Sequence, residues 1–168
     1  AIGRCVPQKG FDVLLSAFAR LKDPALSLTL IGSGSGLPML QKQAEALSIS
    51  GQVCFLGNVS RDEIVNQLHG HDLFVMSSRH ESYGLVVAEA QACGLPVVST
   101  RCGGPEDILT DQTGIFCEPD DPDVLASAIR KAMGRRWDTQ WIREHARSRF
   151  SSSAFTEQLF SIYRSVLK

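Results

Sequence analysis

The sequence predicts an α/β domain built on a parallel sheet with helices on both faces. Apolar runs of about four residues, such as 28–31 and 53–56, alternate with longer segments whose apolar residues recur at helical spacing. Short, wholly apolar runs of this kind are typical of strands in a doubly wound, Rossmann-like parallel sheet. Of the 168 residues, 43% are hydrophobic and 21% are charged, which fits one globular domain with a single core.

Each predicted element has a local signal. The helices repeat apolar residues at helical spacing, as Leu14, Phe18 and Leu21 do, and the strands are short apolar runs. In chain order we expect helix 11–21, strand 28–31, helix 38–47, strand 53–56, helix 60–68, strand 73–76, helix 84–93, strands 96–99 and 115–117, and helices 124–133, 141–150 and 154–167.

Caps and breaks mark several of these boundaries. Ser60, followed by Glu63 three residues later, forms a capping box, and Asp121 before Pro122 begins another helix. Strands stop beyond Gly134, so 135–168 is expected to hold only C-terminal helices. One apolar stripe of the last helix needs a partner surface; it consists of Phe155, Leu159, Ile162, Tyr163 and Val166.

Charge and cysteine content exclude several classes of protein. The 17 Lys and Arg balance 18 Asp and Glu, so no overall field would recruit nucleic acid. The five cysteines lie far apart, which indicates free thiols and a cytoplasmic location. The chain opens at 1–4 as if within a strand, so we expect 1–168 to be one domain excised from a larger protein.

A glycine-rich turn follows the first predicted strand. Gly32, Gly34 and Gly36 precede a helix, so their backbone amides could approach a phosphate or a nucleobase. The dinucleotide fingerprint needs a glycine where Leu37 stands and an acidic residue near position 52, and the sequence has neither. A tight strand-to-helix turn explains the glycines equally well.

Two carboxylates bracket the start of helix 84–93. Glu81 lies in the loop before the helix and Glu89 lies on it. A diphosphate could bind the amides of Tyr83, Gly84 and Leu85, because a helix N-terminus favours anions. Glu89 would then offer two acceptor oxygens to a vicinal diol such as a ribose.

At this point the sequence resembles a known family, the retaining glycosyltransferases of the GT-B fold, in the group 1 (family 4) set. The resemblance covers about the first 130 residues, and its motifs occur in the family's order. They are Gly3-Arg4, Lys9-Gly10, Gly32-Ser33-Gly34, 55–59, Glu81 to Glu89, Pro96-Val97-Val98 and 103–106.

The resemblance assigns a role to each matching residue. It implies that Arg4 and Lys9 clamp the donor diphosphate in place of a metal ion, so that no metal site is expected. It implies that Glu81 contacts the donor sugar and Glu89 the ribose. The remaining donor contacts that it implies are the glycine turn at Gly32 and Gly34, the amides of Tyr83, Gly84 and Leu85 at the phosphate, and Val59 and Arg61 at the nucleobase.

The resemblance also implies a fold and an activity. The chain would be the C-terminal, donor-binding half of a GT-B enzyme, and its donor would be a UDP-type or GDP-type sugar with no cofactor. The enzyme would pass the sugar to an acceptor hydroxyl with retention of configuration. The acceptor, a glycan, lipid or small molecule, would bind an N-terminal domain outside this chain. At Gln91 the family more often has an apolar residue.

Other interpretations remain open. A nicotinamide-dependent oxidoreductase would explain the glycine turn, and a non-catalytic nucleotide-binding module would explain the helix N-terminus. His69, His71 and Asp72 could bind a metal or support a helix end, and His80 could face the sugar. An acidic cluster could be a cation site or could cap a helix; it consists of Glu118, Asp120, Asp121 and Asp123.

A basic segment with interleaved aromatic residues lies near the C-terminus. Seven Lys and Arg residues fall within 130–149. This segment could touch the anionic inner face of a membrane as a peripheral contact, or it could form a solvated face.

Overall fold

Every predicted helix and strand is present in the structure, a computed structural model that describes residues 1–167. The helices are α1 (Phe11–Leu21), α2 (Leu37–Ala46), α3 (Arg61–His69), α4 (Leu85–Ala92), α5 (Pro122–Met133), α6 (Thr139–Phe150) and α7 (Ser152–Val166). The strands are β1 (Leu28–Ile31), β2 (Val53–Gly57), β3 (Phe74–Met76), β4 (Val97–Thr100) and β5 (Gly114–Cys117). Three short 3₁₀ helices were not predicted: η1 (Pro7–Lys9), η2 (Ser50–Gln52) and η3 (Gly104–Asp107). Predicted boundaries differ from the observed ones by at most two residues.

The strands are all parallel, but their hydrogen bonding divides into two sheets. One sheet has the order β1-β2 and the other β3-β4-β5, so the expectation of a single sheet is corrected. Residues 1–3 run beside β1, where Ile2 forms a parallel bridge with Ile31 and Gly3 donates to the Ile31 carbonyl over 2.9 Å. Within residues 1–167 this segment bridges β1 and forms no ladder with β3, so the two sheets stay separate in their hydrogen bonding.

Helices cover both faces of the second sheet. Val97 and Val98 are consecutive on β4 and fully buried, and they belong to different cores. Val98 packs in the core that contains Leu14 of α1 and Leu125 of α5, whereas Val97 packs in the core that contains Val87 of α4. Because successive residues of a strand point to opposite faces of the sheet, both faces of this sheet are buried at β4. The doubly wound α/β class is therefore confirmed.

The capping residues that were predicted do begin helices. The Ser60 hydroxyl accepts from the Glu63 amide over 3.2 Å at the start of α3, but the Glu63 carboxylate accepts from the Gln67 side chain over 2.8 Å, so only half of the predicted capping box forms. The Asp121 carboxylate accepts from the Asp123 and Val124 amides at the start of α5, over 2.8 and 3.1 Å. Both helices thus start where the local sequence satisfies their first free amides.

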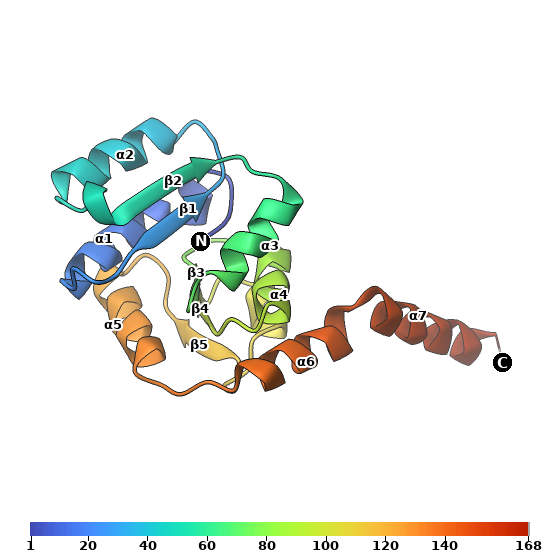
Figure 1. The fold of residues 1–168 in the computed structure, drawn as a ribbon. Coiled ribbons are helices and arrows are strands. Elements are labelled where there is room, and N and C mark those ends of the chain that lie inside the picture. Colours follow the sequence, from blue (N-terminus) through green and yellow to red (C-terminus); the bar gives the residue numbers. More distant parts are fainter. Residues whose placement is uncertain (168) are drawn as a thin grey trace.

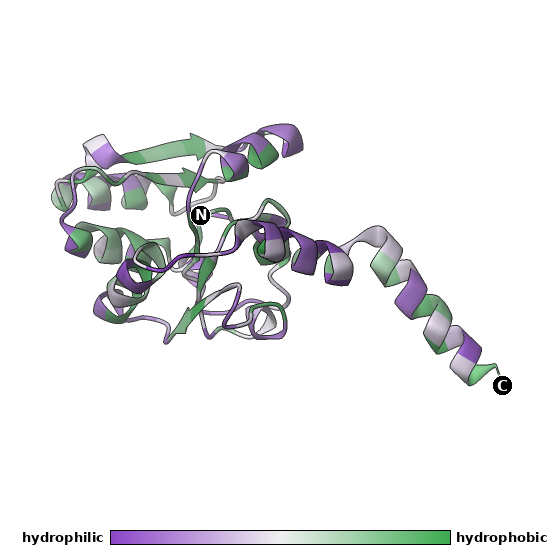
Figure 2. Ribbon diagram, turned by 60° about the horizontal axis from the view of Figure 1, so that its bottom comes forward, coloured by the Kyte–Doolittle hydropathy of each residue, from purple (hydrophilic) through white to green (hydrophobic). Residues whose placement is uncertain are grey.

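The two last helices differ in how they pack. Ile142 and Ala146 of α6 are buried, and α6 packs against α4. Helix α7 extends away from the rest of the molecule and has no buried residue (Figure 1, Figure 2). Within residues 1–167, the predicted apolar stripe of α7 is thus exposed. In that same part of the chain, no helix combines the length and apolarity needed to cross a bilayer.

Candidate functional site

Lys9 and Glu81 meet at the carboxyl ends of the strands. Lys9 ends η1, Glu81 follows β3, and the Lys9 ammonium forms an ion pair with the Glu81 carboxylate. The backbone of Glu81 is fixed by the loop after β4: its amide donates to Cys102 and its carbonyl accepts from Gly104, each over 2.8 Å. Two of the three groups predicted to act on the donor diphosphate and sugar are therefore in direct contact, although they lie 72 residues apart in the chain.

A glycine makes this contact possible. Gly10 caps η1 with φ of 61°, and a Cβ at this position would lie 2.0 Å from the Ser77 carbonyl oxygen. The Ser77 hydroxyl also donates to the Lys9 carbonyl over 3.0 Å. Because no side chain separates the two backbones, the end of η1 lies directly against the loop that carries Glu81.

The charge of Glu81 is stabilised where it lies. Burial alone would raise the pKa of this carboxyl, but the hydrogen bond and charge of Lys9, with the amides of Tyr83 and Ser82, outweigh burial and lower the pKa. Both side chains are mostly covered, with 20% of Lys9 and 17% of Glu81 exposed. Glu81 is thus an anion at neutral pH and already occupies an anion-binding position.

Next to this pair, the N-terminus of α4 is open. Gly84 is its N-cap and supplies no side-chain hydrogen bond. Within residues 1–167, the amides of Gly84 and Leu85 have no protein acceptor. Free amides at a helix start carry a partial positive charge that suits a phosphate.

A cleft of about 880 Å³ adjoins this helix start, because Tyr83 and Leu85 contribute to its lining. Arg61 and Glu89 both line it and form an ion pair at 3.7 Å, and Tyr83 and Leu85 form part of the wall. Residues from α6 and α7, including Phe155, complete the lining. The cleft thus brings together four residues that the sequence analysis assigned to the nucleotide.

The structure gives the glycine turn a packing role. The Gly32 amide donates to the Gly57 carbonyl over 2.7 Å, so it is taken up inside the protein. Side chains here would collide with the backbone of segment 3–5, because a Cβ at Gly32 would lie 1.9 Å from the Gly3 oxygen and a Cβ at Gly34 2.6 Å from the Cys5 oxygen. The turn therefore lets the segment that carries Arg4 lie against β1.

Two other predicted residues lie apart from these pairs. Arg4 is exposed, and in the described part of the chain it forms no ion pair. Val59 is half-buried in the loop after β2, two residues before Arg61. Their proposed contacts with the diphosphate and the nucleobase stay predictions.

Several of the remaining candidates serve the fold. One ring nitrogen of His71 lies 2.9 Å from the Thr29 hydroxyl, which is a structural contact and not a metal ligand set. Of the acidic cluster only Asp121 caps α5, so capping was wrong for the others: Asp123 pairs with Arg20, Glu118 with Arg101 and Asp120 with Arg79. No group of three or more metal-ligating side chains gathers within residues 1–167.

Part of the basic segment also serves the fold. Arg130 donates to the Arg20 carbonyl, Arg143 to the Cys93 carbonyl over 3.1 Å, and Arg149 to the Asp107 carbonyl over 2.9 Å. These three arginines cap backbone groups of the domain. The Arg135 guanidinium lies over the Trp137 ring at 4.2 Å.

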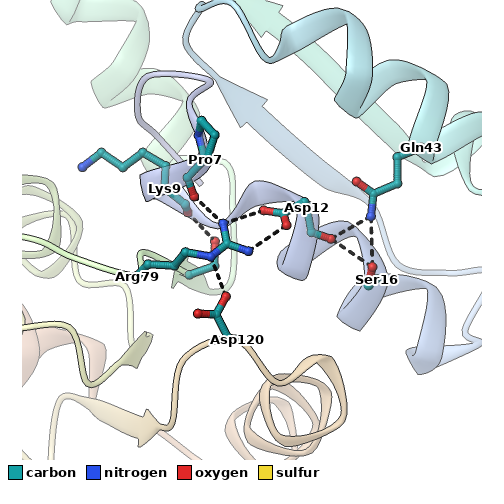
Figure 3. A network of polar contacts seen from close by, with 8 residues as sticks. Pro7, Lys9, Asp12, Ser16, Gln43, Arg79 and Asp120 are labelled. Carbon is teal, nitrogen blue, oxygen red and sulfur yellow. Dashed lines mark hydrogen bonds and ion pairs between the residues drawn. The ribbon is translucent and has the colours of Figure 1, made fainter.

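Sequence reasoning assigned no role to Arg79 or Asp12. The Arg79 guanidinium binds the Asp12 carboxylate through two hydrogen bonds of 2.9 and 2.8 Å, and it also reaches Asp120 (Figure 3). Burial raises the pKa of Asp12, but the hydrogen bond and charge of Arg79 outweigh it and lower that pKa. The position of this arginine, two residues before Glu81, was the one sign in the sequence of a role at the site. Its partners could not be predicted, because they lie far from it in the chain.

We expect the free energy of unfolding to fall as the pH drops below about 5. Asp12 and Glu81 have folded pKa values below those of ordinary carboxyls, which lie near 4, so the unfolded chain takes up protons first. Their stabilisation is complete above the ordinary pKa and is lost as the pH falls through the folded value. Urea unfolding at pH 7, 5, 4 and 3 measures this.

The matched variants are Asp12→Asn and Asp111→Asn. Asp12→Asn should make unfolding less dependent on pH, because it removes one of the groups with a lowered pKa. Asp111 is exposed and should leave the dependence unchanged. Equal pH profiles for wild type and Asp12→Asn would contradict the assignment.

A cation and an open helix N-terminus at the carboxyl ends of parallel strands form the arrangement of nucleotide-binding α/β domains. The cleft begins beside this helix start, at Tyr83 and Leu85, and continues along α4, α6 and α7. The chain belongs to the family described as glycosyl transferases group 1, whose sequence model matches residues 1–149.

Curated relatives agree with this family. The chain is 41% identical over 132 residues to the lipopolysaccharide core biosynthesis glycosyltransferase LpsE of Rhizobium meliloti, covering 78% of this chain and 38% of that protein. It is 36% identical to the D-inositol 3-phosphate glycosyltransferase of Corynebacterium jeikeium, covering 96% of this chain and 42% of that protein. The chain thus spans about two fifths of the length of these relatives.

Solved structures share the fold. Anabaena HepE in complex with UDP superposes with a TM-score of 0.85 at 26% identity, covering 98% of this chain and 47% of HepE. The C-terminal domain of LpcC from Francisella tularensis gives a TM-score of 0.72 at 24% identity, covering 86% of this chain and 78% of that domain. The fold is therefore that of a domain within GT-B glycosyltransferases.

Proposed function

We propose that this chain is the donor-binding part of a retaining glycosyltransferase that uses a nucleoside diphosphate sugar. The observation that carries the proposal is the Lys9–Glu81 pair beside the open N-terminus of α4, next to the cleft with Arg61 and Glu89. The crystals of HepE with UDP and with UDP-glucose support a uridine nucleotide. The acceptor would bind parts of the whole protein outside this chain.

Each group then has a defined task. Lys9 and Arg4 bind the diphosphate and, with the amides of Gly84 and Leu85, stabilise the charge that grows on it as it leaves. Glu89 accepts hydrogen bonds from the ribose hydroxyls. Glu81, which is paired with Lys9, would contact the sugar where it joins the diphosphate.

The transfer itself needs no covalent step on the protein. The bond between the sugar C1 and the diphosphate oxygen breaks, and a bond from C1 to the acceptor oxygen forms on the same face. The acceptor proton passes to the departing diphosphate. The protein contributes by holding the donor and by neutralising the leaving group before the reaction begins.

We expect UDP or GDP to bind this chain equally well in EDTA and in Mg²⁺. Lys9 and Arg4 supply the countercharge that a metal ion would otherwise provide. Isothermal titration with UDP, GDP and NAD in both buffers measures this, and NAD should not bind. A strict need for Mg²⁺ would contradict the cationic clamp, and tight binding of NAD alone would favour an oxidoreductase.

Catalysis is tested in the whole protein. Purified full-length enzyme should transfer a sugar from the nucleoside diphosphate sugar that binds this domain, and the product should keep the anomeric configuration of the donor. Proton NMR of the anomeric signal distinguishes retention from inversion. An inverted product would overturn the front-face mechanism, and the absence of transfer to any acceptor would favour a nucleotide-binding module.

A further inference from the structure

Arg79 connects three segments of the domain. Its guanidinium holds both oxygens of Asp12 at the start of α1, and its Nε donates to Asp120 after β5 over 2.5 Å. The same guanidinium donates to the carbonyl of Pro7 in η1. Asp12 is in turn connected to α2, because the Gln43 side-chain amide donates to the Asp12 backbone carbonyl over 2.8 Å (Figure 3).

These anchors lie on both sides of Lys9 in the chain. Pro7 begins the short helix that Lys9 ends, and Asp12 follows three residues later. The backbones join as well: the Arg79 amide donates to the Gln8 carbonyl over 2.8 Å, and the Gln8 side chain donates to the His80 carbonyl over 3.3 Å. Segment 77–80 is therefore bound along segment 7–12, and Glu81 comes next.

The geometry of Arg79 suits orientation more than stability. Its side chain is 30% exposed, and its partners Asp12 and Asp120 are 48% and 57% exposed. Ion pairs this open to solvent make only a modest contribution to the free energy of unfolding, and the pH dependence assigned to Asp12 is part of it. A planar guanidinium bound at two oxygens nevertheless fixes the direction of both partners, which a lysine could not do.

We propose that Arg79 is a positioning residue that holds Lys9 and Glu81 in register for the donor diphosphate, an inference that rests on the proposed function. In this role the Arg79 side chain binds protein groups, namely Asp12, Asp120 and the Pro7 carbonyl, and makes no contact with the donor. Figure 3 shows the Lys9 side chain extending away from the Arg79 guanidinium, which lies between Asp12 and Asp120. Arg79 acts on the site only through the backbone of η1 and the loop after β3.

The test compares the affinity for UDP with the affinity for uridine. If the titration described above shows that GDP binds instead, GDP and guanosine are compared. The ratio of the two affinities measures what the diphosphate contributes. Arg79→Met should lower the ratio about threefold to tenfold, and Arg79→Lys should restore it only in part. In a Lys9→Ala background, Arg79→Met should change the ratio less than about twofold, because the group that Arg79 positions is already gone.

Controls separate this role from general loss of structure. Arg20→Met removes a different surface ion pair, which joins Arg20 of α1 to Asp123 of α5 at 2.7 Å, and should leave the ratio unchanged. Asp120→Asn removes one exposed partner of Arg79 and should lower the ratio in the same direction, even if Arg79→Met fails to fold. Circular dichroism and thermal unfolding verify the fold of each variant.

The outcomes are distinguishable. Failure of the wild type to bind either nucleotide would overturn the proposed function itself. If the wild type binds and folded Arg79→Met has an unchanged ratio, the positioning role alone is overturned. If Arg79→Met does not fold, an unchanged ratio in Asp120→Asn overturns it in the same way. Additive losses in Arg79→Met and Lys9→Ala would also overturn it, because independent effects would mean that Arg79 does not act through Lys9.

Discussion

Replacing Lys9 with alanine is expected to weaken UDP binding by about tenfold to a hundredfold and to leave uridine binding almost unchanged. A direct charge-assisted contact with a phosphate is worth about 1.5–3 kcal/mol, which corresponds to that range. Lys9 is only 20% exposed, so water could replace the lost ammonium only partly. Isothermal titration of UDP and NMR titration of uridine give the two affinities.

Two matched variants sharpen this prediction. Lys131→Ala removes an exposed cation of α5 and should not change UDP binding. Glu81→Gln should leave UDP binding unchanged or strengthen it, because it removes the negative charge that is paired with the Lys9 ammonium. In the whole enzyme, the same variant should reduce sugar transfer. If Glu81→Gln weakened UDP binding and Lys9→Ala did not, the two roles would be reversed.

Local signals in the sequence were sufficient to predict the elements. The run that includes Val97 and Val98 is short and apolar, which is enough to predict a strand buried on both faces. Ser60 and Asp121 mark helix starts because their side chains accept hydrogen bonds from the first free amides. The division into two sheets could not be predicted. It depends on how far residues near Ile2 continue beside Ile31, which is a property of long-range pairing.

The site was predictable to the extent that its residues lie in matching motifs. Glu81 and Lys9 were both identified, although neither the distance between them nor their ion pair has a local signal. Arg79 was missed for the same reason, since its partner Asp12 is 67 residues away. For Gly32 the sequence is equally consistent with a ligand contact and with a tight turn. The long-range hydrogen bond from its amide to the Gly57 carbonyl has no local signal.

Replacing Gln91 with methionine is expected to raise the free energy of unfolding by about 1–3 kcal/mol. Gln91 lies on α4 with none of its surface exposed, and among residues 1–167 neither its amide nitrogen nor its carbonyl oxygen has a hydrogen-bond partner. Folding thus removes a polar group from water and returns nothing for it. Methionine has nearly the same length and shape without that cost.

The same change at Gln43 should have the opposite sign. The Gln43 amide donates to the Asp12 carbonyl over 2.8 Å and to the Ser16 hydroxyl over 3.0 Å, so Gln43→Met loses two hydrogen bonds and should lower the free energy of unfolding by about 1 kcal/mol or more. Urea unfolding of both variants gives the comparison. Gln91 lies two residues from Glu89, so UDP titration of Gln91→Met verifies that the site is intact. Destabilisation by Gln91→Met would mean that its amide is satisfied, for example by a buried water, and that the cost assigned to it is wrong.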